Sequence, residues 1–145
     1  MKRKYLIIIL LVVIAIIGFV FYNQIPDMKP IYNIKKLVIS NGNEPLYLKS
    51  KTWGMTYDSK VIVLSTNEEE EFTADSTKDY IYDGASFLFY KFSNDSLFIY
   101  TADKAHTPQV FNSKIQIKQI ELDNPAMTKL KGDSAFRSRG LTEFK

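Results

Sequence analysis

The chain contains two kinds of hydrophobic pattern, a long uncharged run near the start and short broken runs after it. The first run extends from Tyr5 to Tyr22 and contains no charged residue. As a helix it is about 27 Å long, close to the roughly 30 Å hydrocarbon thickness of a bilayer. The tyrosines stand at its two ends, where amphipathic rings favour the headgroup layer. Residues 1–22 are therefore predicted to be a basic tip and a transmembrane anchor.

The charges on either side of this run predict its orientation. Lys2, Arg3 and Lys4 precede it, and the next basic residue is Lys29. The positive-inside rule places such a basic flank in the cytoplasm. We therefore expect a single-pass protein of the cytoplasmic membrane, held by membrane lipid around its N-terminal helix. Its C-terminal domain is then expected in the periplasm or outside.

A cleaved signal peptide shares the basic and apolar parts of this pattern. The apolar core of a signal peptide is usually shorter, and small residues stand at cleavage spacing near its end. Here Ile16 and Gly18 are the nearest candidates, and isoleucine is a poor occupant of a cleavage site. We therefore expect a retained anchor, with cleavage as the alternative.

Beyond the anchor, the sequence favours β-structure. Residues 23–30 contain two prolines and predict a short stalk. Residues 31–132 are short apolar runs separated by turn residues such as Asn41-Gly42, without helical periodicity over more than about two turns. They predict an extracytoplasmic all-β domain, a small antiparallel β-sandwich or barrel of about seven to nine short strands. Residues 133–145 are expected to be a poorly packed tail or an edge strand.

Two segments give the clearest strand signals. The run Val61–Leu64 is continuously apolar and β-branched, which is typical of a strand covered on both faces. The segment Ser86–Thr101 predicts a hairpin if Asn94-Asp95 forms a two-residue turn, and both of its faces are largely apolar. The expected cross-strand pairs are Phe92 with Leu97, Tyr90 with Ile99, Leu88 with Thr101, Lys91 with Phe98, and Phe89 with Tyr100.

The segment Lys114–Leu122 begins with strict alternation and then changes phase after Ile117. A β-bulge is the simplest explanation, and two shorter strands are the alternative. After it, Asn124-Pro125 is expected to begin a short helix that Gly132 ends.

Charge and composition exclude several classes of function. The chain has 19 basic and 16 acidic residues, and Lys2, Arg3 and Lys4 account for the excess. The remainder is neutral, which argues against a nucleic acid partner, because phosphate binding needs clustered positive charge. The chain has no cysteine, so disulfides, thiol catalysis and thiolate metal sites are excluded.

Four short motifs of strand and turn residues lie within residues 45–122. They are Trp53-Gly54, Val61–Ser65 (VIVLS), Lys78–Tyr82 (KDYIY) and Asp95–Tyr100 (DSLFIY). Together they resemble small membrane-anchored or exported β-rich proteins of Bacteroidota such as flavobacteria. The resemblance implies a bacterial chain with an extracytoplasmic domain, and it implies no activity, substrate or catalytic residue.

Polar candidates for chemistry are few. His106 is the only histidine, and Asp103 could orient it as a general base. No nucleophile is placed beside it, so a solvated loop histidine is the favoured interpretation. The acidic residues Glu68–Glu71, Asp75 and Asp79 could offer oxygen ligands to Ca²⁺, but their spacing matches no calcium loop. We therefore expect a solvated loop there, with no metal and no cofactor.

Aromatic residues are dense between Tyr80 and Tyr100. The phenylalanines among them are expected in the core. Tyr80 and Tyr82, together with Trp53, form the candidate interaction surface, although a core position is favoured for Trp53. We expect a non-enzymatic module that binds a protein partner of the cell envelope. The alternative is a small β-barrel in which the aromatic hairpin lines a cavity for a lipid or other apolar ligand.

Overall fold

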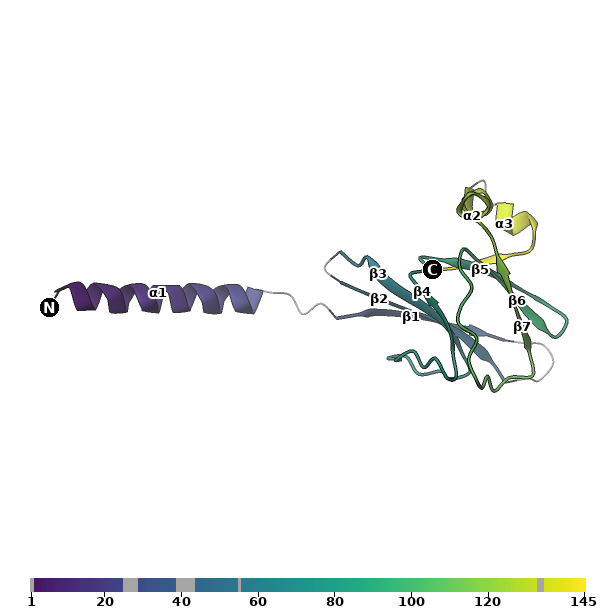
Figure 1. Ribbon diagram of the computed structural model, residues 1–145, viewed down its shortest axis with the longest axis horizontal. Coiled ribbons are helices and arrows are strands. Elements are labelled where there is room, and N and C mark those ends of the chain that lie inside the picture. The colour runs from purple at the N-terminus through teal and green to yellow at the C-terminus, as the bar shows by residue number, and fades with distance from the viewer. Residues whose placement is uncertain (1, 25–28, 39–43, 55, 133–134) are drawn as a thin grey trace.

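The computed structural model describes residues 2–24, 29–38, 44–54, 56–132 and 135–145 (Figure 1). Within these residues the chain forms eight strands in two sheets, together with three helices. The predicted β-rich fold is therefore confirmed, and the number of strands lies in the expected range.

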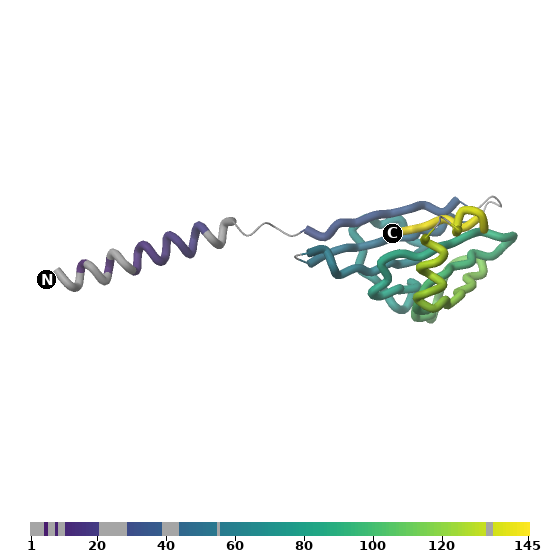
Figure 2. The backbone as a smooth tube through the Cα atoms, turned by 90° about the horizontal axis from the view of Figure 1, so that it is seen from above, coloured from purple at the N-terminus to yellow at the C-terminus, as the bar shows by residue number. Residues whose placement is uncertain are grey.

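Helix α1 (Lys2–Gln24) forms where the long apolar run predicted a helix. The side chains described in it are those of Tyr5, Ile8 and residues 11–20, and all of them are exposed. Figure 2 shows this helix apart from the two sheets. The predicted anchor residues Lys2, Arg3, Lys4 and Tyr22 have side chains that lie outside those described. Within the described part of the chain, no helix has the length and apolar character that crossing a membrane requires.

The first sheet is a meander of consecutive antiparallel strands. It contains β1 (Ile31–Leu37), β2 (Leu46–Trp53), β3 (Ser59–Ser65) and β4 (Tyr80–Asp83), in that order. The run from Val61 to Leu64 is buried throughout, as expected for a strand covered on both faces. The turn predicted at Asn41-Gly42 and the middle of the predicted stalk lie outside the described residues.

The second sheet has the order β7 (Gln116–Glu121), β6 (Ser96–Thr101), β5 (Leu88–Ser93) and β8 (Thr142–Phe144). Strands β5 and β6 form the predicted hairpin, and its turn residue Asn94 has a φ of 52°, a left-handed conformation that asparagine tolerates. The register confirms the pairs Phe92 with Leu97, Tyr90 with Ile99, Lys91 with Phe98, and Phe89 with Tyr100.

Strand β7 differs from the prediction in two ways. It pairs with β6 in parallel rather than antiparallel, and its register continues from Gln116 to Glu121 without a bulge. The change of phase has another cause. Ile117 packs against the core between the sheets, whereas Leu122 packs against the opposite core, beneath the helices. Because both faces of this segment are covered, its apolar positions change face without any break in pairing.

The C-terminal residues are an integral part of the second sheet. Helix α2 (Asn124–Lys131) begins after the N-cap Asp123 and ends at Gly132, close to the predicted boundaries. Helix α3 (Ala135–Ser138) and strand β8 follow, and β8 pairs with β5. The side chains of Phe136 and Phe144 are buried. The prediction of a poorly packed tail was therefore wrong, and its alternative, an edge strand, is confirmed.

Three apolar clusters hold these elements together. The largest lies between the two sheets and includes Leu48 and Ile62 from the first sheet and Leu97 and Ile99 from the second. A second cluster joins the outer face of the second sheet to α2 and α3. The third lies on the outer face of the first sheet, beneath the connection between β3 and β4. Both sheets are therefore covered on both faces.

Candidate functional site

The connection between β3 and β4, residues 66–79, crosses the outer face of the first sheet, and we call it the acidic loop. Its one large apolar residue, Phe72, is buried against Val61 and Val63 of β3. The ring of Phe72 also meets that of Tyr32 edge to face, with ring centroids 5.8 Å apart. Its glutamates from Glu68 to Glu71 are exposed, so the expected solvated acidic run is present but is fastened to the sheet by an aromatic side chain.

Beneath the acidic loop lies a lysine that β2 places on the outer face of the sheet. Lys49 is only 2% exposed, and its Nζ stands 4.9 Å from the centroid of the Phe72 ring. Burial lowers the pKa of Lys49 from its ordinary value of 10.5, while the negative charges of Asp79 and Glu69 oppose that shift. The aromatic ring and the nearby carboxylates therefore offset part of the cost of burying the charged amine.

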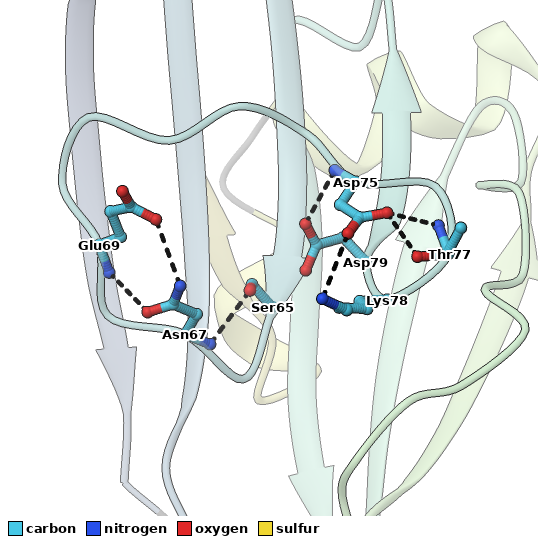
Figure 3. Close-up of polar contacts among 7 residues, drawn as sticks. All are labelled: Ser65, Asn67, Glu69, Asp75, Thr77, Lys78 and Asp79. Carbon is cyan, nitrogen blue, oxygen red and sulfur yellow. Dashed lines mark hydrogen bonds and ion pairs between the residues drawn. The ribbon is translucent and has the colours of Figure 1, made fainter.

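A compact turn stabilises the second half of the acidic loop (Figure 3). The backbone N–H and the hydroxyl of Thr77 both donate to Oδ1 of Asp75, at 2.9 and 2.6 Å. These bonds lower the pKa of Asp75, and the neighbouring Lys78, 3.7 Å away, contributes to the same shift. The backbone N–H of Asp75 donates to Oδ2 of the buried Asp79 at 3.1 Å. This turn fixes the Asp79 carboxylate near Lys49.

The first half of the loop is held by a second set of local bonds (Figure 3). Ser65 Oγ accepts from the backbone N–H of Asn67 at 3.1 Å, and Asn67 Oδ1 accepts from that of Glu69 at 3.2 Å. The Tyr47 hydroxyl donates to a carboxylate oxygen of Glu68 at 2.9 Å, which ties the loop to β2. The loop therefore has a defined conformation at both of its ends.

These residues line a small, open polar pocket of about 250 Å³. Its walls include Lys49, Ser65, Phe72 and Asp79. This volume is slightly below the range of about 300–1,000 Å³ typical of pockets for drug-sized ligands. The residues around it supply two amines and three carboxylates, with no imidazole among them. In the described part of the chain, no group of three histidine or acidic side chains is placed to hold a metal ion.

The residues of the predicted interaction surface lie in three different environments. Tyr82 is 2% exposed in the core between the sheets, so its predicted surface role was wrong. Tyr80 is half-buried and packs edge to face on Phe111, with ring centroids 5.0 Å apart. Both tyrosines point inward because positions two apart in a strand share a face. Trp53, favoured as a core residue, is instead 38% exposed at the end of β2.

The burial of Tyr82 leaves a polar atom in the core. Among the residues that the structure describes, its hydroxyl has no hydrogen-bond partner, and burial raises its pKa well above the ordinary value of 10.0. The hydroxyl is therefore neutral and makes no contribution to a surface site.

His106 lies where the sequence favoured it, in an exposed position. Its backbone forms an isolated antiparallel bridge with Ile81. Asp103 is also exposed, and its backbone carbonyl accepts a bond from the Thr101 hydroxyl. The described contacts of these two residues are therefore those of a surface connection.

Sequence reasoning missed Lys49. In the run from Leu46 to Ser50 the leucines alternate with Tyr47 and Lys49, and that alternation does not show that the face of Lys49 is covered. The signal that points the other way is Phe72, an aromatic residue within an otherwise polar loop. A buried ring in that position implies an apolar surface beneath it, and Val61 and Val63 on the outer face of β3 provide that surface.

No protein-family model, curated protein or solved structure matches the chain. Inference about its function therefore rests on its own residues and their arrangement.

Proposed function

We propose that the chain is a single-pass membrane protein that holds a small β-sandwich at the outer face of a bacterial cytoplasmic membrane. In this proposal residues 1–22 are the anchor, and the domain is a non-enzymatic module that binds a protein of the cell envelope. The basic tip from Lys2 to Lys4 supports a cytoplasmic N-terminus.

One observation carries the proposal. From Leu11 to Val20, every side chain of α1 is apolar or absent and is exposed. Such a helix has no polar face to turn toward water, and a bilayer would cover all of its sides at once. The apolar run continues from Tyr5 to Tyr22, beyond the stretch in which every side chain is described.

The filled interior of the domain favours an interaction module over a ligand-binding barrel. The aromatic hairpin of β5 and β6 turns Tyr90 and Ile99 into the core between the sheets. Its other face turns Phe89 toward α2 and α3. Side chains therefore occupy the space that an apolar ligand would need on either side of this hairpin.

Alkaline extraction of membranes from cells that express the full chain tests the anchor. The chain should stay in the membrane pellet, and protease added on the periplasmic side should digest the β domain. The variant Ile14→Lys/Ile17→Lys should be released, because two charges at the centre of the helix oppose insertion. Release of the unchanged chain into the soluble fraction would refute the anchor.

Crosslinking followed by affinity capture of the full-length chain tests the interaction. One envelope protein should be recovered reproducibly with it. Recovery of bulk membrane proteins alone, in repeated trials, would contradict the interaction role while leaving the anchor in place.

A further inference from the structure

Three exposed apolar residues lie at one end of the first sheet, and we call this group the aromatic end. Trp53 closes β2 and is 38% exposed, Tyr57 lies in the following turn at 50%, and Ile31 begins β1 at 55%. Ile31 is paired with Thr52, the neighbour of Trp53 in the sequence, so Ile31 and Trp53 lie at the same end of the sheet on its opposite faces. Trp53 and Tyr57 flank the same turn, and exposed tryptophan and tyrosine side chains are enriched at membrane interfaces.

Two described residues of the turn between β2 and β3 have positive φ, and one of them is the exposed Tyr57. Tyr57 has a φ of 53°, a left-handed conformation that costs an aromatic residue free energy. Its N–H donates to the carbonyl of Gly54 at 3.2 Å. Gly54 itself has a φ of 98°, and a Cβ there would stand 2.7 Å from the Asp58 carboxylate. The turn therefore requires this glycine, and it displays the tyrosine ring at an energetic cost.

The position of the aromatic end follows from the connection to α1. The helix ends at Gln24 and β1 begins at Ile31, so the segment 25–30 can separate them by at most about 25 Å. Ile31 is therefore held close to the end of the helix, and the turn between β2 and β3 lies beside it. Figures 1 and 2 both show this turn at the end of the domain that faces α1.

Lysines surround the aromatic end. Lys51 Nζ lies 5.7 Å from the centroid of the Tyr32 ring and 5.9 Å from that of Trp53. Lys29 is exposed just before β1, and Asp58 in the turn carries the opposing charge. An indole and a phenol flanked by ammonium groups match the headgroup layer of a membrane. There the rings lie between water and hydrocarbon, and lysines approach lipid phosphates.

We propose that the aromatic end rests in the headgroup layer of the same bilayer that holds α1, and so fixes how the β domain stands on the membrane. This inference rests on the proposed anchor. The occupant of the surface is lipid, because the short connection keeps the surface within reach of that bilayer whatever other protein is present. Lipids with anionic phosphate headgroups fit best, because the neighbouring lysines favour negative charge.

Trp53 is the only tryptophan in the chain, so its fluorescence reports on the aromatic end without labelling. The full chain is reconstituted into vesicles of phosphatidylcholine with phosphatidylglycerol, with or without bromine on the acyl chains near the headgroup. Brominated lipid should reduce Trp53 emission at least about twofold, as expected for a ring at the headgroup level. Iodide in the surrounding water should quench it weakly.

The matched control moves the reporter to the other end of the domain. Val110 is exposed, and its backbone N–H donates to the Thr77 carbonyl near the opposite end of the sheet. That end is about 25 Å from Trp53, the length of an eight-residue strand. In the variant Trp53→Tyr/Val110→Trp, brominated lipid should leave the emission unchanged and iodide should quench it.

Three outcomes would overturn the inference in distinguishable ways. If the chain floats with the vesicles while iodide quenches Trp53 emission and brominated lipid does not, the aromatic end faces water. The inference then fails, and the proposed anchor is retained. If Trp53 is protected from both quenchers, another protein surface, such as a second copy of the chain, covers it instead of lipid. If the chain does not float with the vesicles, the proposed anchor fails as well.

Discussion

The outer faces of the two sheets are covered in contrasting ways. On the second sheet, α2 and α3 bury Phe89 beneath an apolar cluster, and the Phe89 ring stacks on Phe136 with centroids 5.0 Å apart. On the first sheet, the acidic loop supplies the ring of Phe72 and the buried Asp79, which lie over the buried Lys49 of β2. The cover of the second sheet is a small hydrophobic core. The cover of the first sheet is a polar cap, the acidic loop over Lys49, in which Phe72 is the one buried aromatic residue.

The two covers are expected to contribute to stability in different ways, one independent of pH and the other dependent on it. Burial of apolar side chains stabilises the fold at every pH at which the chain is folded. A buried amine and carboxylate instead make stability depend on protonation. The cover formed by α2 and α3 is therefore expected to hold the domain together, and the acidic loop is expected to be the part whose stability depends on pH.

The largest expected effect comes from Phe89→Ala, which removes a buried ring from the apolar cover. The free energy of unfolding should fall by about 3–5 kcal/mol, the range measured for buried phenylalanines. Chemical denaturation monitored by circular dichroism measures it. Phe98→Ala is the matched control, because Phe98 lies in the neighbouring strand but is only half-buried. An equal loss in both variants would contradict the special role of the apolar cover.

Phe72→Ala should have a smaller effect on stability, about 2–3 kcal/mol, because a surface loop can relax around the missing ring more readily than packed helices. Its distinguishing consequence is local. Hydrogen exchange should accelerate across residues 66–79 and leave α2 unchanged. Equal acceleration in α2 would mean that the two covers are not independent.

Lys49→Met tests the polar cap directly. At neutral pH we expect a change in the free energy of unfolding of less than about 1 kcal/mol, because the lost cation–π contact offsets the relief from burying a charge. The pH dependence should change more clearly. The pKa of Lys49 is lowered in the folded state, so between that pKa and 10.5 the unfolded state binds more protons, and stability rises with pH.

Between the folded-state pKa of Lys49 and 10.5, the free energy of unfolding of Lys49→Met should lack this increase with pH. Denaturation curves recorded across that pH range measure it. Lys51→Met, on the same face of β2 but half-buried, is the control. Identical pH profiles for the wild-type chain and Lys49→Met would show that the buried amine has no part in the response.

The smallest effect is expected from Asp75→Asn, which keeps an acceptor for Thr77 and removes the charge. Because the folded-state pKa of Asp75 lies below 3.8, its charge stabilises the fold above that pH, and this contribution disappears as the pH falls through the folded-state pKa. The variant should therefore be slightly less stable than wild type at neutral pH and equal to it in acid. A difference that persists in acid would point to altered turn geometry.

The contrast also explains what the sequence could predict. The hairpin of β5 and β6 was predictable in register, because the turn at Asn94-Asp95 and the alternation on both sides are local signals. Local sequence does not reveal which distant segment covers a face of a sheet. Lys49 was missed and Tyr82 was misassigned for that reason: alternation divides a strand into two faces, but which of them is covered depends on distant residues.

The same limitation applies to β7 and to the C-terminal residues. A parallel partner for β6 and an edge position beside β5 depend on how the chain returns after Thr101 and Gly132. The exposed position of Trp53 is a further case. Its neighbour Gly54 indicated a turn, but a turn alone does not determine whether the adjacent indole is covered.

The pairing of β8 with β5 also sets the order in which the domain can fold. The first sheet closes by consecutive hairpins, so each strand finds its partner after a short loop closure. The second sheet must instead bring Phe144 back to Leu88 across the intervening β6, β7 and α2. Long closures slow folding, so the meander and the aromatic hairpin should form first. The strand Thr142–Phe144 is then expected to pair with β5 last and to complete the second sheet.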